Sequence, residues 1–176
     1  MMKVRNMALS ALFAALLTIC AWIAVPAAQI AFTLQTLAVF LTLGLLGGKW
    51  GTVTIVVYLV MGAVGIPVFS GFQGGIGALL GATGGYLWGF LASGLVYWLL
   101  TSMLPANRFS RLISMVAGQI ACYGLGTLWF YFMYLQGGET SVRLVIAQCV
   151  LPYLVPDGAK LFLAWILTGR LSRFVY

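Results

Sequence analysis

One carboxylate and one ammonium group stand close together in an otherwise apolar part of this sequence. The segment LPYLVPDGAK, residues 151–160, contains Asp157, the only aspartate of the chain, and Lys160 three positions later. Residues three apart on a helix lie on one face, so these two side chains can form an ion pair. Each charge costs about 2.5 to 3.5 kcal/mol at the centre of a membrane helix, so it is retained where it is satisfied. The pair therefore indicates either a structural ion pair that holds neighbouring helices or the polar part of a ligand site.

This chain contains few of the residues that catalyse reactions in enzymes. There is no histidine, and Glu139 is the only acidic residue besides Asp157. This composition excludes Ser-His and Cys-His dyads, carboxylate pairs and histidine-based metal sites. We expect neither an enzyme nor a metal site. Three cysteines, in separate apolar runs without the spacing of metal ligands, are interpreted as buried apolar residues: Cys20, Cys122 and Cys149.

Two glycine-containing stretches resemble nucleotide-binding motifs only loosely. The stretch GGIGALLG, residues 74–81, follows no strand of a βαβ unit, and LGGKW, residues 46–50, lacks the spacing and the Ser or Thr of a P-loop. The sequence therefore predicts no ATP site. If this protein moves a solute against a gradient, the energy comes from a partner or from an ion, and ion coupling usually requires more than one buried acid.

The composition is that of a polytopic membrane protein. Apolar residues make up 63% and charged residues 6% of the 176 residues, and the mean hydropathy is +1.10; in soluble domains about a quarter of residues are charged. At about 20 residues for each span, the chain has room for roughly six helices and no further soluble domain. The basic N-terminus imitates a signal peptide, but its apolar run is long enough to be kept as a helix. We predict a single all-α transmembrane domain over residues 1–176.

Apolar runs and helix breakers place the helices along the chain. The predicted helices cover about 5–25, 34–47, 51–66, 85–104, 112–135 and 143–169. The second and third are joined by the tight turn GGKWG into a hairpin, and the last is broken near Pro152 and Pro156. Pro156 suits the first turn of a helix and would leave free backbone N–H groups near Asp157. Seven of the twenty residues 67–86 are glycine, so this segment after the third helix is predicted to be a structured re-entrant or capping loop.

The basic residues predict the orientation in the membrane. Short loops rich in Lys and Arg stay cytoplasmic, so both termini are predicted to be cytoplasmic. The net charge of +7 is mainly this signal, with some attraction to anionic lipid, and does not indicate nucleic-acid binding. The segment QIAFTLQT, the glycine-rich loop and the approach to Pro152 then converge on the outer face. The predicted cytoplasmic set is Lys3, Arg5, Lys49, Arg108, Arg111, Arg170 and Arg173, against Arg143 alone outside and Lys160 within the final span.

Three stretches together resemble the BioY family, the biotin-binding S components of energy-coupling factor (ECF) vitamin transporters. They are FTLQTLAVFLTLGLLGGKWG, GAVGIPVFSGFQGGIGALLGATGGYLWGF and LPYLVPDGAKLFLAWIL, and the resemblance spans nearly the whole chain. The glycine-rich block followed by TGGY is the specific signature, although Ala82 stands where a proline is common in the family and the stretch around Pro156 varies. The resemblance implies a six-helix membrane fold. It also implies an outward-facing biotin pocket that is covered by the loops after helices one and three.

The resemblance also implies which residues contact the ligand. Biotin has a ureido group with two N–H donors and one carbonyl, so Asp157 is expected to accept from the N–H groups and Lys160 to donate to the carbonyl. Residues of the first outer loop are expected to add polar contacts, unless they cap the second helix. Residues of the glycine-rich loop are expected to close over the solute, unless that loop merely packs. These additional residues are Thr33, Gln35 and Thr36 in the first loop and Gly75, Gly77, Thr83 and Tyr86 in the second.

Two alanines of the first helix carry the expected partner contact. Ala11 and Ala15 in MALSALFAALL are four apart, and small residues at this spacing allow close helix approach in a membrane. In the resembled family such a pair docks on the membrane-embedded T component, which works with two ATPase subunits; an internal packing face is the alternative. The expected function is biotin uptake across a prokaryotic cell membrane, with biotin as ligand and no cofactor. An S component for another vitamin, and an ion-coupled carrier or channel that works alone, are the alternatives.

Overall fold

The described part of the chain is almost entirely helical. The computed structural model describes residues 2–25, 32–135 and 142–175. In these residues four helices are long and apolar enough to cross a membrane, namely α1, α2, α4 and α5, which confirms the prediction of an all-helical membrane protein. A short antiparallel strand pair was not predicted. The elements are α1 (Met2–Trp22), β1 (Ala24–Val25), β2 (Phe32–Thr33), α2 (Gln35–Ala63), the 3₁₀ turn η1 (Ser70–Phe72), α3 (Ile76–Leu80), α4 (Gly84–Met103), α5 (Arg108–Leu135), α6 (Val142–Cys149) and α7 (Leu151–Val175).

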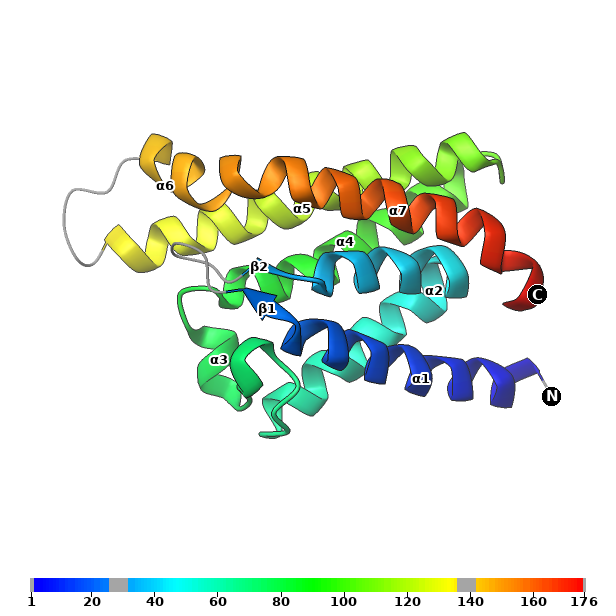
Figure 1. Cartoon of the computed structure of the whole chain (residues 1–176), viewed down its shortest axis with the longest axis horizontal. Coiled ribbons are helices and arrows are strands. Elements are labelled where there is room, and N and C mark those ends of the chain that lie inside the picture. Colours follow the sequence, from blue (N-terminus) through cyan, green and yellow to red (C-terminus); the bar gives the residue numbers. More distant parts are fainter. Residues whose placement is uncertain (1, 26–31, 136–141, 176) are drawn as a thin grey trace.

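The helix α2 consists of two arms that fold back on each other. Gly47 interrupts it with backbone angles of φ 76° and ψ 171°, which glycine adopts without a steric penalty. The chain reverses at this point (Figure 1), and a Cβ added to Gly51 would lie 2.9 Å from the Cα of Leu43. The missing side chain at Gly51 therefore lets the two arms approach closely. This reversal confirms the predicted hairpin at GGKWG.

Most of the long helices run roughly along the long axis of the molecule, which therefore has two distinct ends. Figure 1 shows the two termini, the reversal of α2 and the connection from α4 to α5 at one end, here called the terminal end. The strands, α3 and α6 lie at the opposite end, here called the loop end. The basic residues divide between the two ends as predicted. Lys3, Arg5, Lys49, Arg108, Arg111, Arg170 and Arg173 belong to segments of the terminal end, and Arg143 belongs to α6.

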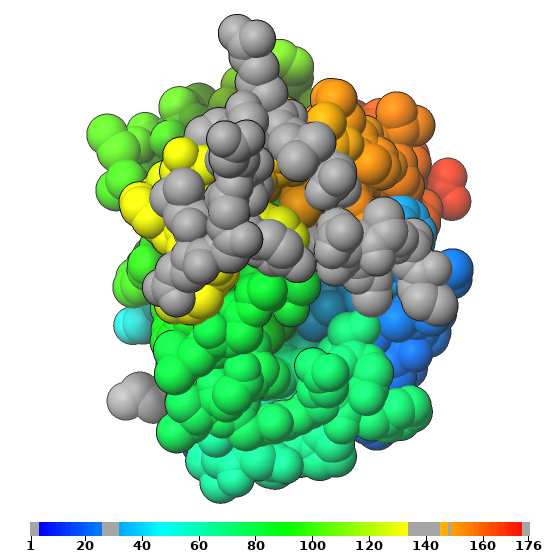
Figure 2. All heavy atoms as spheres, turned by 90° about the vertical axis from the view of Figure 1, so that its left-hand side faces the viewer, coloured from blue at the N-terminus to red at the C-terminus, as the bar shows by residue number. Residues whose placement is uncertain are grey.

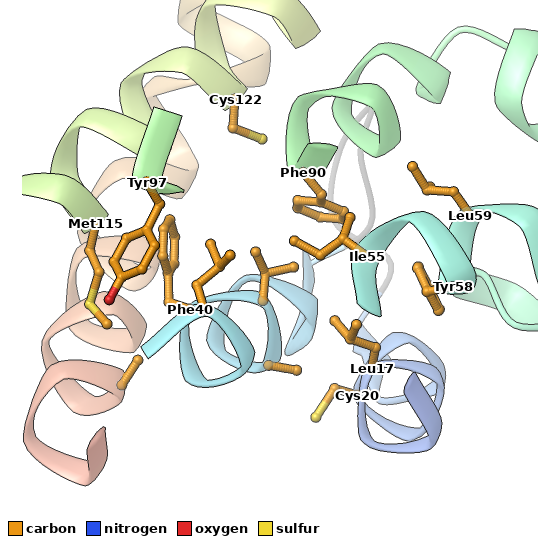
Figure 3. Close-up of a cluster of buried hydrophobic side chains, with 14 of the residues drawn as sticks. Leu17, Cys20, Phe40, Ile55, Tyr58, Leu59, Phe90, Tyr97, Met115 and Cys122 are labelled. Carbon is orange, nitrogen blue, oxygen red and sulfur yellow. The ribbon is translucent and has the colours of Figure 1, made fainter. Parts of the chain in front are cut away.

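The main core joins α1, α2, α4, α5 and α7, and Figure 3 shows part of it. Leu17, Ile55 and Met115 from three of these helices are fully buried in it. Small residues bring α4 against α5, because a Cβ added to Gly89 would lie 2.8 Å from the Sγ of Cys122. This packing forms the rigid scaffold on which the loop end is built.

The glycine-rich segment is a structured loop and not a membrane-crossing helix, in agreement with its composition. Before α4 begins at Gly84, it holds only η1 and the five-residue α3. Gly75 has φ +89°, and its N–H donates a hydrogen bond of 2.6 Å to the carbonyl of Gly62 at the end of α2. The indole of Trp129 in α5 donates to the carbonyl of Gly81 at 3.0 Å. These contacts attach the loop to α2 on one side and to α5 on the other.

The last apolar stretch is broken earlier than Pro156. α6 ends at Cys149 and α7 begins at Leu151, so Pro152 occupies the first turn of α7. Pro156 lies inside α7, which continues through it as a helix. The prediction that Pro156 begins a helix is therefore wrong. Its missing N–H leaves only the carbonyl four residues earlier without its usual helical donor, which neighbouring groups can compensate in membrane helices. The predicted polar turn QGGETS, which includes Glu139, lies outside the described residues.

Candidate ligand-binding site

A cavity of about 320 Å³ lies among the elements of the loop end, within the size range of small-molecule pockets. Figure 2 looks onto this end, where α3 and the start of α4 occupy the lower part of the face and the α6–α7 region the upper part. The lining combines polar groups with aromatic and aliphatic walls. The lining residues are Thr33, Gln35, Thr36, Phe69, Ser70, Gly71, Gln73, Ala78, Thr83, Tyr86, Leu87, Phe90, Gln119, Cys122, Tyr123, Cys149, Tyr153, Asp157 and Lys160.

The charged pair formed by Asp157 and Lys160 is buried and lies on the cavity wall. Lys160 Nζ is 2.8 Å from Asp157 Oδ1, and both side chains are 9% exposed. The three-residue spacing within α7 therefore forms the expected ion pair. The second carboxylate oxygen of Asp157 accepts a hydrogen bond of 2.7 Å from the hydroxyl of Tyr123 in α5. Both oxygens are thus held in place, and about two of the four acceptor positions of a carboxylate stay open for a ligand.

Lys160 also reaches the segment before α2. Its Nζ donates a hydrogen bond of 2.7 Å to the backbone carbonyl of Thr33 and lies 3.8 Å from the centroid of the Phe32 ring. The Phe32 ring in turn stacks on Tyr153, with centroids 6.2 Å apart. The cation is therefore paired with a carboxylate, a carbonyl and an aromatic face. Through these contacts the ion pair joins α7 to β2 and also presents its polar groups to the cavity.

Thr33, Gln35 and Thr36 line the cavity beside this pair. Gln35 and Thr36 belong to the first turn of α2 and not to a loop. The Gln35 side-chain oxygen accepts a hydrogen bond of 3.1 Å from the Thr33 hydroxyl, and its amide nitrogen donates at 2.8 Å to the hydroxyl of Tyr58. The Tyr58 hydroxyl in turn donates a hydrogen bond of 2.9 Å to the backbone carbonyl of Val68. The Gln35 backbone N–H also donates to the Thr33 hydroxyl at 3.3 Å, so Thr33 partly performs the capping role considered as its alternative.

The expected residues of the glycine-rich loop divide into two groups. Thr83 and Tyr86 line the cavity, whereas Gly75 and Gly77 do not. A Cβ added to Gly75 or Gly77 would meet no atom within 4 Å. The loop instead reaches the cavity through a set of residues that was not predicted, namely Phe69, Ser70, Gly71, Gln73 and Ala78.

Comparison with known proteins places this architecture in a family. The family model described as "BioY family" matches residues 1–176. The chain belongs to the BioY family. It is 36% identical over 169 residues to the biotin transporter BioY of Thermotoga maritima, covering 96% of each chain. It is 35% identical over 171 residues to the probable biotin transporter BioY of Pyrococcus horikoshii, covering 97% of this chain and 98% of the relative. The predicted family is thereby confirmed.

A protein of known structure shares this fold. A crystal structure of the S component for biotin from an ECF-type ABC transporter superposes with a TM-score of 0.83 at 25% sequence identity. The match covers 98% of this chain and 93% of the other. The helical architecture is therefore that of an S component.

The alanine pair of this BioY chain lies on the outside of α1. Ala11 and Ala15 are exposed, whereas Ala14 is 2% and Leu17 0% exposed on the packed side of the same helix. Ala11 and Ala15 therefore do not form an internal packing face within the described chain.

Outside the glycine-rich loop, three further lining residues carry polar groups that the sequence did not single out. Tyr123 orients Asp157, Tyr153 stacks on Phe32, and Gln119 lies one turn before Tyr123 on the same face of α5. An isolated polar residue in an apolar helix has no motif around it. The four-residue spacing of Gln119 and Tyr123 is the one available signal, since such residues share a face. Among the described residues there is no group of three His, Cys, Asp or Glu side chains that could hold a metal.

Proposed function

We propose that this BioY chain binds biotin and takes it up as the S component of an ECF-type transporter. The observation that carries the proposal is the buried Asp157–Lys160 pair on the wall of a cavity of about 320 Å³. A buried charge pair next to empty space suits a solute with matching polar groups. The protein is accordingly a transport component and not an enzyme.

The chemistry of biotin fits the distribution of groups around this cavity. Asp157 has free acceptor positions for a ureido N–H, because among the described residues its two oxygens hold only Lys160 and Tyr123. The ammonium of Lys160 offsets the carboxylate charge and lies beside the expected position of the ureido carbonyl. Phe69, Leu87 and Phe90 offer apolar walls for the thioether ring. The carboxylate tail would then extend to the exposed rim, where Gln73 and Thr83 offer neutral donors.

The loop end would face the outside and the terminal end the cytoplasm. The segregation of basic residues to the terminal end supports this orientation, because positive loops stay inside. We further propose that α1, both arms of α2, α4, α5 and α7 all cross the membrane, as a single domain. The 25 residues of α7 exceed the length of about 20 residues that a span needs. Its charged pair is satisfied within the protein, so the pair does not prevent insertion.

The loops of the loop end would cover the bound solute. Gly75 supports this role indirectly, because its left-handed backbone and its hydrogen bond to Gly62 set the course of the loop. Thr83 supports it directly, since it lines the cavity, whereas Tyr86 lines the cavity from the first turn of α4. Gly77 lies in α3 away from the cavity, and its contribution would be confined to the flexibility of the loop.

Energy for uptake would come from a T component and two ATPase subunits. The exposed small side chains of Ala11 and Ala15 support docking, because they let another helix approach α1 closely. In the described residues Asp157 is the only carboxylate within the helices, which disfavours an ion-coupled carrier that works alone.

Calorimetric titration of the purified protein with biotin, riboflavin and thiamine tests the ligand. We expect tight binding of biotin and none of the other two; preference for another vitamin would reassign the S component. Uptake of labelled biotin in a host with and without the T and ATPase subunits tests the energy source. We expect fast uptake only with these partners, and equal uptake without them would favour the carrier that works alone.

A further inference from the structure

Gln119 has a buried acceptor without a donor next to the proposed ligand. Its side chain lines the cavity, yet among the described residues its Oε1 has no hydrogen-bond partner. An unsatisfied buried polar atom costs roughly 1–3 kcal/mol, so native structures rarely keep one without a reason. An acceptor of this kind on a cavity wall indicates that the missing donor belongs to the solute.

The position of Gln119 relates it to the charged pair. It precedes Tyr123 by four residues on α5, so the two side chains lie on the same face of the helix. The Tyr123 hydroxyl is hydrogen-bonded to Asp157 at 2.7 Å. The amide of Gln119 therefore belongs to the same wall as the carboxylate but comes from a different helix.

The geometry of a cyclic urea requires two separate acceptors. In a five-membered cyclic urea the two N–H bonds flank the carbonyl and point to opposite sides of the ring. Hydrogen bonds weaken steeply when they are bent, so one carboxylate cannot receive both N–H groups in good geometry. Asp157 can take one of them, and the other needs an acceptor elsewhere on the wall.

The other polar lining groups suit this role less well. Gln35 Oε1 already accepts a hydrogen bond from Thr33 at 3.1 Å. The Tyr86 hydroxyl is buried and without a partner among the described residues, but a hydroxyl can itself donate and also suits a carbonyl. The Oε1 of Gln119 can only accept, and thus requires an N–H or O–H donor.

We propose that Gln119 binds the ureido group by accepting a hydrogen bond from the N–H that Asp157 does not hold. This inference rests on the proposed function and adds a specificity residue to it. A site that holds each N–H with its own acceptor rejects a solute that lacks one of them, because a buried acceptor is then left unpaired.

Titrations with the full-length protein and three ligands test this assignment. The ligands are biotin and the two isomers methylated on one or the other ureido nitrogen; the variants are Gln119→Leu and Gln119→Met. We expect both variants to weaken biotin binding by about tenfold, the scale of one hydrogen bond at a buried site. Ser114→Ala is the matched control, because Ser114 is buried on the same helix, donates to Ser110 and does not line the cavity.

The methylated ligands separate direct contact from an effect on the fold. Each isomer should bind the wild-type protein more weakly than biotin. For the isomer whose methyl group replaces the hydrogen facing Gln119, the losses from the variant and from the methyl group should not add. Additive losses for both isomers, or wild-type affinity in both variants, would overturn the assignment.

The wild-type titrations decide the matter even where a variant unfolds. If one methylated isomer binds the wild-type protein as well as biotin does, only one N–H is held and the proposal for Gln119 is wrong. If the wild-type protein binds no biotin, the proposed function itself fails and this inference fails with it. If the wild-type protein binds biotin and both Gln119 variants bind it with the same affinity, the proposed function stands and the inference alone fails.

Discussion

The hydroxyl of Tyr123 donates a hydrogen bond of 2.7 Å to Oδ2 of Asp157, and thereby connects α5 to α7 at the cavity wall. Lys160 holds the other oxygen of the same carboxylate at 2.8 Å. The carboxylate is therefore fixed before any ligand arrives. A fixed acceptor binds more tightly than a mobile one, because less conformational entropy is lost on binding.

Replacing Tyr123 by phenylalanine tests this preorganisation. The variant keeps the ring and removes only the hydroxyl, so we expect the fold to persist and biotin affinity to fall by about three- to tenfold. This loss is smaller than the roughly 1.5–3 kcal/mol of a hydrogen bond to a charged group, because the bond between Tyr123 and Asp157 is also made without the ligand. Calorimetry gives the affinity and thermal denaturation gives the stability. Tyr131→Phe is a matched control, since Tyr131 also lies on α5 but does not line the cavity. Equal affinities for the two variants would show that Asp157 needs no support from Tyr123.

Asp157→Ala, Asp157→Asn and Lys160→Ala test the charged pair itself. Each change leaves the other partner as an uncompensated buried charge, which costs more than one ordinary hydrogen bond. We expect each to weaken biotin binding by at least about 2 kcal/mol, or about thirtyfold. The double variant should bind poorly but fold no worse than either single one. If affinity survives in Asp157→Ala while the melting temperature collapses, the pair is structural and the ligand lies elsewhere.

Most of the helical layout could be predicted from the sequence, because apolar runs and glycine-rich turns report directly on what a membrane tolerates. The reversal at Gly47 is an example, since only glycine adopts its backbone angles easily. Pro156 was misjudged because helix continuity depends on neighbouring groups that a local pattern does not contain.

Within the candidate site, the sequence located the charged pair but not its surroundings. Asp157 and Lys160 are conspicuous because charges are costly in an apolar helix. Gln119 and Tyr123 are less conspicuous, since an amide or a phenol in a long helix is compatible with many environments. The strand residues Phe32 and Thr33 acquire their contacts with Lys160 only through tertiary packing, across more than a hundred residues of chain.

The glycine-rich loop offers a comparison between two neighbouring glycines. Gly75 has φ +89°, a backbone angle at which a β-branched side chain is strained by about 1–3 kcal/mol. Its N–H also donates a hydrogen bond to the carbonyl of Gly62. We expect Gly75→Val to shift the loop and weaken biotin binding. Gly77→Val is the control, because Gly77 is helical, has no atom within 4 Å of an added Cβ and does not line the cavity. Calorimetry on both variants checks this prediction. Unchanged biotin affinity in Gly75→Val would show that ligand binding does not depend on the backbone path of the loop.

The exposed face of α1 allows docking to be separated from ligand binding. Ala11 and Ala15 are exposed near the middle of α1, and neither of them lines the cavity. Changing both to tryptophan adds bulk where a partner helix would pack, so we expect loss of co-purification with the T component and of ATP-driven uptake. Biotin binding to the isolated protein should stay near wild type, because the core side of α1, including Ala14 and Leu17, is unchanged.

A second double variant controls for bulk alone. Leu95 and Leu99 are also four apart and exposed, at 50% and 60%, on α4. Changing both to tryptophan enlarges a lipid-facing surface without touching α1, and should leave both uptake and co-purification intact. Uptake assays and pull-downs on the two double variants, run beside calorimetry, distinguish the possibilities. Loss of biotin binding in the Ala11/Ala15 variant would assign these alanines to the fold, whereas equal loss of uptake in both variants would indicate a general sensitivity to surface bulk and not a docking face on α1.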